Sequence, residues 1–122
     1  MNLRLRRPEG MALKTEMHGE VAVIVLKGKL MGGPDTKILH DTVKDLIEKG
    51  KRKIVVDLAG VKWMNSTGLG ALMGALTTAR NNEADLKLAN TTEKVESLFM
   101  ITKLITVFDT YNSVIEAAAS FD

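Results

Sequence analysis

Three adjacent residues with short hydroxyl or amide side chains, Asn65, Ser66 and Thr67, are followed by Gly68-Leu69-Gly70. Such side chains accept hydrogen bonds from the unpaired N–H groups at a helix start, and one cap contributes about 1 kcal/mol. A helix needs only one cap, and glycine lets another molecule approach the backbone closely. These residues therefore suit either a plain helix cap or a site for binding or modification, and both interpretations stay open from the residues alone.

Other residues with reactive side chains give weaker signals. The two histidines, His18 and His40, fall on different expected elements and are interpreted as surface residues. Asp57 ends an expected strand, where sites of α/β proteins often lie. Three further acids are expected on the solvated polar face of one helix: Asp35, Asp41 and Asp45. We find no phosphate-binding loop or nucleophile motif, and we predict no catalytic residue, no metal site and no cofactor.

The hydrophobic pattern predicts the elements that position Ser66. Apolar residues recur at helical spacing after the polar run, which predicts an amphipathic helix to about Arg80. Gly70 and Gly74 on this helix are interpreted as positions of close helix–sheet packing. The expected elements in chain order are strands 12–18 and 21–26, a helix from Pro34 to Gly50, strand 54–58, the helix just described, strand 86–89, a helix capped by Asn90 and Glu93, strand 105–108, and a helix capped by Ser113 and Glu116.

This order of elements predicts a single α/β domain. Strands that alternate with helices form a mostly parallel sheet through right-handed crossovers, and the first two strands add an N-terminal antiparallel hairpin. We expect about four helices. Residues 1–11 are predicted to be a flexible leader, and residues 12–122 are predicted to form the domain.

Composition argues against several classes of function. The net charge is only +2 and the longest apolar run, residues 21–26, is far shorter than the roughly 20 residues of a membrane-spanning helix. We therefore expect no direct nucleic-acid partner and no membrane partner. Arg4, Arg6 and Arg7 are interpreted as a solvated terminus, with an acidic partner as the alternative. The chain has no cysteine, which fits a reducing compartment and a cytoplasmic protein.

Residues 54–73 resemble the signature of the STAS family, specifically of bacterial anti-sigma factor antagonists. The matching features are an apolar strand, Asp57-Leu58, and the run Met64-Asn65-Ser66-Thr67-Gly68-Leu69-Gly70. The order of elements agrees over about residues 12–120. The resemblance implies a STAS-type fold.

The resemblance also implies a partner-switching cycle. An unmodified antagonist binds an anti-sigma factor with serine kinase activity, which frees a sigma factor for transcription. The kinase then uses ATP to phosphorylate a serine that corresponds to Ser66, the complex separates, and a serine phosphatase resets the antagonist. The same resemblance assigns partner binding to residues around Ser66: Asn65, Thr67, Gly68 and Leu69. The domain would be a substrate of the kinase and not itself an enzyme.

One residue departs from the signature, because Asn65 stands where the family usually has aspartate. Asparagine still caps a helix, but it removes a negative charge beside the phosphoacceptor. An alternative function therefore stays open, in which the chain is a scaffold subunit of a stress-signalling or lipid-transport assembly and Ser66 is never phosphorylated. A second alternative, from another class, is a small nucleotide-binding protein or enzyme that uses residues 65–70.

Overall fold

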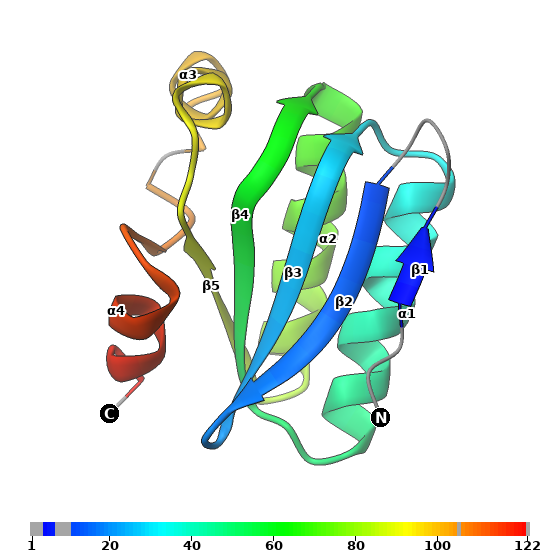
Figure 1. Cartoon of the computed structure of the whole chain (residues 1–122), viewed down its shortest axis with the longest axis vertical. Coiled ribbons are helices and arrows are strands. Elements are labelled where there is room, and N and C mark those ends of the chain that lie inside the picture. The colour runs from blue at the N-terminus through cyan, green and yellow to red at the C-terminus, as the bar shows by residue number, and fades with distance from the viewer. Residues whose placement is uncertain (1–3, 7–10, 105, 122) are drawn as a thin grey trace.

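Six strands form one sheet in the computed structural model, which describes residues 4–6, 11–104 and 106–121. The strands lie side by side in chain order, from β1 at one edge to β6 at the other. Figure 1 shows β1 to β5 in this order. Their bounds are β1 Arg4–Arg6, β2 Met11–His18, β3 Val21–Leu30, β4 Lys53–Met64, β5 Asp85–Ala89 and β6 Thr110–Tyr111.

The pairing pattern confirms the predicted α/β class. β2 runs antiparallel to β3, with Met11 opposite Gly28 and His18 opposite Val21, and β1 runs antiparallel to β2. The β3–β4, β4–β5 and β5–β6 pairs are parallel. β4 continues past the predicted end at Leu58 to Met64, so it carries the chain directly to Asn65.

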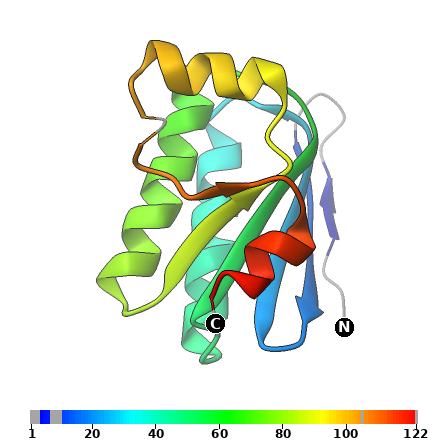
Figure 2. The ribbon, with the colours of Figure 1, turned by 90° about the vertical axis from the view of Figure 1, so that its left-hand side faces the viewer.

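Helices cover both faces of the sheet and one of its ends. α1 (Pro34–Glu48) and α2 (Ser66–Asn81) lie side by side on one face. α4 (Val114–Ala119) packs on the opposite face near β4 and β5, and α3 (Glu93–Ile101) lies across the end of the sheet where β4 finishes (Figure 2). The described residues form four helices, as expected.

The main core lies between the sheet and the α1–α2 layer. Ile24, Leu58 and Leu72 come from β3, β4 and α2, and none of them is exposed. A smaller cluster on the other face joins Val23 and Val55 to Ala117 of α4. The continuous apolar runs in β3 and β4 are explained by this burial on two sides.

The strand expected at residues 105–108 is wrong where the structure describes the chain. Residue 105 lies outside the described residues, and residues 106–108 form a turn followed by a bend. Phe108 is buried and stacks on Phe99 of α3, with ring centroids 5.4 Å apart. Its apolar character reflects this packing, and the last strand, β6, follows it with only two residues.

Two further expectations concern local boundaries. The N-cap of α3 is Thr92 and not Asn90, because the Thr92 hydroxyl accepts from the N–H of Val95 at 3.4 Å. Of the predicted leader 1–11, residues 1–3 and 7–10 lie outside the described residues, while Arg4–Arg6 forms β1 and Met11 begins β2. The flexibility of that leader stays a prediction.

Candidate functional site

Asn65 caps α2 and places Ser66 and Thr67 at its first turn. The backbone of Asn65 is extended (φ −108°, ψ −179°), its Oδ1 accepts from the N–H of Gly68 at 2.8 Å, and its carbonyl accepts from the N–H of Leu69 at 2.9 Å. Ser66 and Thr67 are exposed. Within the described part of the chain, their N–H groups have no hydrogen-bond partner. The exposed serine thus stands beside free donors and the positive end of the α2 dipole.

Gly68 and Leu69, expected to contact a partner, lie beneath the surface. Leu69 is 2% exposed and belongs to the main core. Gly68 is buried against the carbonyl of Leu30, and a Cβ at this position would stand 1.9 Å from that oxygen. These two residues therefore fix the position of the first turn of α2, and the accessible part of the predicted site is Asn65, Ser66 and Thr67.

The turn after β3 packs directly against the start of α2. Gly32 has φ +87°, and a Cβ there would come within 2.1 Å of the Thr67 methyl group. Only glycine allows both this conformation and this close approach. The turn before Pro34 is thus also one side of the site.

Asp35 holds this turn from inside and was missed by the sequence interpretation, which placed it on a solvated helix face. Its side chain is 0% exposed, and its carboxylate accepts from the N–H of Met31 at 3.2 Å. The sequence signal was its position in the first helical turn, directly after a glycine pair and Pro34, where carboxylates accept from free N–H groups.

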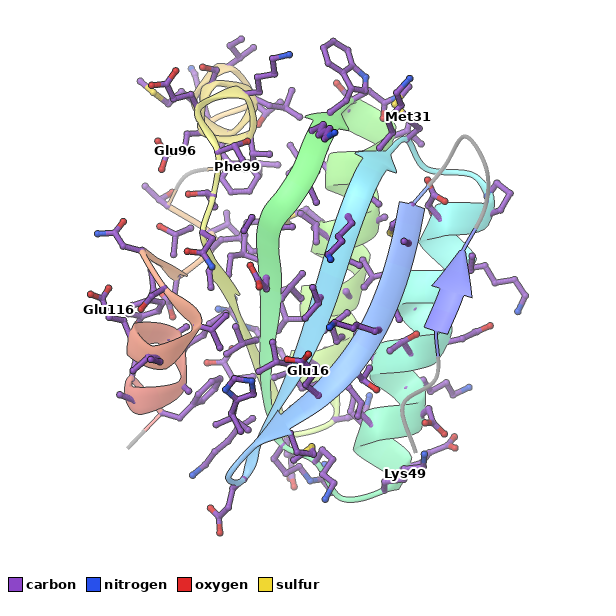
Figure 3. The ribbon with its side chains drawn as sticks, viewed as in Figure 1. Glu16, Met31, Lys49, Glu96, Phe99 and Glu116 are labelled. Carbon is purple, nitrogen blue, oxygen red and sulfur yellow. The ribbon has the colours of Figure 1, made fainter. Side chains whose placement is uncertain are left out.

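Large apolar side chains lie exposed near the same end of the sheet. Met31 is 40% exposed and Trp63 is 46% exposed. Figure 3 shows Met31 just beyond the end of β3. Lys94 of α3 places its ammonium 5.6 Å from the centre of the Trp63 ring. Aromatic residues and methionine are enriched at protein interfaces, so the surroundings of Ser66 suit docking of a protein partner.

The other candidate residues are not brought to this end. His40 contacts Thr78 between α1 and α2, and Asp57 accepts from Asn90 and from the N–H of Ala59. His18 and Lys14 hydrogen-bond to Glu16, and these bonds, that of Lys14 first, hold the pKa of the Glu16 carboxyl below its ordinary value of 4.5.

The structure corrects the interpretation of two glycines on α2. Gly70 and Gly74 were expected to pack against the sheet, but both are exposed, and a Cβ at either would meet nothing within 4 Å. Gly74 lines a shallow groove between α1 and α2. Among the described residues, no cluster of three or more His, Cys, Asp or Glu side chains could hold a metal ion, and no helix has the length and apolar character to cross a membrane.

The family model of the STAS domain matches residues 12–117, which include the whole α2 site. The chain belongs to the STAS domain family. This agrees with the resemblance in residues 54–73 and with the observed fold.

Curated relatives in this family include the anti-sigma-B factor antagonists of Staphylococcus aureus and Staphylococcus epidermidis. Each is 33% identical over 66 residues, which are 54% of this chain and 61% of the relative. The matched region thus spans about three fifths of the length of these curated relatives.

Solved structures share the fold. An anti-sigma factor antagonist from Mycobacterium paratuberculosis superposes with a TM-score of 0.74 at 19% identity, over 95% of this chain and 97% of the other. The phosphorylated form of SpoIIAA, a Bacillus cell fate determinant, superposes with a TM-score of 0.69 at 20% identity, over 90% and 99% of the two chains.

Proposed function

We propose that this STAS domain is a cytoplasmic anti-sigma factor antagonist that is switched by phosphorylation of Ser66. In this role it binds an anti-sigma factor with serine kinase activity and thereby releases a sigma factor. The kinase supplies nucleotide and magnesium, a serine phosphatase removes the phosphate, and the domain performs no catalysis itself. The names of the staphylococcal relatives support this role.

The observation that carries the proposal is the exposed Ser66 hydroxyl at the first turn of α2. Within the described part of the chain, the N–H groups of Ser66 and Thr67 have no hydrogen-bond partner at the positive end of the helix. Together with the dipole they would stabilise an anion here by about 0.3–1 kcal/mol. The free domain can therefore carry a phosphate without unfolding.

A bound partner changes this balance. Asn65, Ser66 and Thr67 would lie in a desolvated interface, together with Met31 and Trp63. A phosphate adds about −1.5 to −2 charges, and an unpaired charge buried in an interface costs on the order of 2–5 kcal/mol. This corresponds to a loss of affinity from about 30-fold to several thousandfold. Repulsion at one surface is sufficient for release, and the fold itself need not change.

Two measurements test the proposal. The first is the affinity of Ser66→Ala and Ser66→Asp for an anti-sigma factor with serine kinase activity that binds the unmodified domain. We expect Ser66→Ala to bind and Ser66→Asp to bind at least tenfold more weakly. Thr77→Asp is a matched control, because Thr77 is exposed on the same helix but far from its start. Equal affinities of the two Ser66 variants would remove the basis of the switch.

The second measurement is transfer of phosphate from ATP by that partner, followed by mass spectrometry of the domain. The alternative of a scaffold subunit is favoured by Asn65, which lacks the carboxylate of the family signature. A scaffold would form stable large assemblies and take no phosphate on Ser66, whereas the proposed switch requires the phosphate on Ser66 and its absence from Ser66→Ala.

A further inference from the structure

Lysines gather around Trp63 on the sheet face that α1 and α2 leave open. Lys27 and Lys29 of β3 alternate with Leu26 and Leu30, which point into the main core and are 0% exposed. The two lysines therefore point to the opposite side. Trp63 pairs with Lys29 in the parallel β3–β4 register. Lys94 approaches the ring from α3. We name Lys27, Lys29, Trp63 and Lys94 the lysine–tryptophan patch.

The charge of this patch is not balanced by the described acids. Lys27, Lys29 and Lys94 are exposed, and none forms an ion pair within residues 4–6, 11–104 and 106–121. Several lysines elsewhere do form ion pairs, namely Lys14, Lys37, Lys49 and Lys53.

Acids on the neighbouring elements are few. The carboxylate of Asp57 already accepts from Asn90 and the N–H of Ala59. Glu96 of α3 accepts from the hydroxyl of Thr91, which precedes the helix, and Glu93 lies in the first turn of α3. The patch thus offers several cations around one half-exposed aromatic ring, a surface complementary to negative charge and to an apolar side chain.

We propose that the lysine–tryptophan patch docks an acidic segment of the partner protein, with an apolar side chain of that segment packed on Trp63. The proposal rests on the proposed function only for the identity of the partner. A polypeptide fits better than nucleic acid, because the patch offers a single ring, contains no arginine, and belongs to a chain with a net charge of only +2. Exposed Met31 extends the apolar surface at the same end of the sheet.

This docking surface adjoins Ser66. Ser66 is three positions after Trp63 in the chain, so their Cα atoms are at most about 11 Å apart, close to one Debye length in physiological salt. A phosphate on Ser66 therefore reduces the positive potential of the patch and repels an acidic segment bound there. A negative group at Ser66 weakens binding of such a segment.

Trp63 is the only tryptophan in the chain, and its fluorescence reports on the patch directly. The probe is a short peptide of Glu-Glu-Leu repeats, which lacks aromatic residues, titrated into the full chain at low and high salt. We expect a shift of the Trp63 emission that saturates and that weakens at high salt. Lys29→Glu and Lys94→Glu each weaken binding by about threefold to tenfold, and Ser66→Asp weakens it by about twofold or more.

Lys44→Glu is the matched control, because Lys44 is exposed on α1, on the other face, with no ion pair among the described residues. Lys44→Glu changes the net charge by the same amount as Lys29→Glu and Lys94→Glu, and it should alter the affinity for the peptide less than twofold. An equal loss for Lys44→Glu, or no saturable response of Trp63, overturns the proposal. Tighter binding to single-stranded DNA or phosphatidylserine vesicles than to the peptide, sensitive to the same lysines, overturns the assignment to a protein partner.

The two proposals fail in different ways. If Ser66→Asp weakens binding of the anti-sigma factor while Lys29→Glu and Lys94→Glu bind the peptide like the unmodified chain, only the patch is refuted. If the peptide result holds while the two Ser66 variants bind the anti-sigma factor equally, only the phosphorylation switch is refuted.

Discussion

Gly68 gives the sharpest test of how the site is positioned. It is the third residue of α2, and its backbone lies against the carbonyl of Leu30 at the end of β3. In Gly68→Ala the new Cβ would stand 1.9 Å from that oxygen, whereas carbon–oxygen contacts normally begin at about 3.3 Å. The oxygen belongs to a paired strand and cannot rotate away as a flexible side chain would. Strand and helix must therefore separate by more than about 1 Å.

The magnitude follows from two opposing terms. Overpacking of this kind costs about 1–3 kcal/mol, and replacing glycine by alanine within a helix returns about 1 kcal/mol or less. We expect a net loss of about 1–2 kcal/mol in the free energy of unfolding. Gly70→Ala and Gly74→Ala are matched controls on the same helix, since a Cβ there meets nothing within 4 Å. Each should be more stable by about 0.4–1 kcal/mol.

Urea denaturation of the three variants, followed by circular dichroism, provides the measurement. In thermal unfolding, 1 kcal/mol corresponds to a shift of about 3–6 °C for a domain of this size. The order of stability should be Gly74→Ala and Gly70→Ala above the unmodified chain, and Gly68→Ala below it. A Gly68→Ala variant as stable as Gly70→Ala would refute the close contact between α2 and Leu30.

Three further perturbations have defined outcomes. Asn65→Ala removes the bond to Gly68 and should lower the free energy of unfolding by about 1 kcal/mol, while Asn65→Asp, which keeps the bond, should not; urea titration distinguishes them. Lys87→Met removes two hydrogen bonds from the buried ammonium to Ser120, one to its carbonyl at 3.2 Å and one to its hydroxyl at 2.8 Å. Proteolysis near α4 should therefore be faster in this variant. An unchanged rate of cleavage would show that Lys87 does not hold α4 in place. The pKa of Glu16 is lowered in the folded state, so this carboxylate contributes stability above pH 4.5. That stability is lost as the pH falls through the folded pKa. On acidification below pH 4.5, Glu16→Gln should therefore lose less stability than the unmodified chain, as measured by urea titration.

Local signals predicted most of the fold. The 3.6-residue period of apolar residues predicted α2. Gly50, predicted to close α1, follows the end of that helix with φ +81°. The Ser113 hydroxyl accepts from the N–H of Glu116 at 3.0 Å, as the predicted capping pair implied. Each of these signals lies within a single helix or directly at its end. The strand expected at Phe108 was wrong because an apolar residue that follows a turn and is buried against a helix gives the same local pattern as a short strand.

The candidate site was predictable where its chemistry is local and not where it depends on distant contacts. Asn65 capping α2 follows from sequence. The burial of Gly68 depends on its contact with Leu30. The position of α4 depends on Lys87, which hydrogen-bonds to Ser120, 33 positions away. The exposure of Gly70 and Gly74 depends on how α1 lies beside α2. No pattern within one element contains this information.

The departure at Asn65 has a physical consequence for the proposed switch. An aspartate cap would place a negative charge at the positive end of α2 and so offset the dipole that stabilises a phosphate on Ser66. The amide of Asn65 makes the same cap bond to Gly68 at 2.8 Å without that charge, so a phosphate meets less repulsion in the free domain. Beneath it, Gly68 and Asp35 fix α2 and the turn after β3 by buried contacts. In the proposed switch, the charge at this surface changes while these buried contacts keep the backbone in place, so electrostatics would set the affinity for the partner.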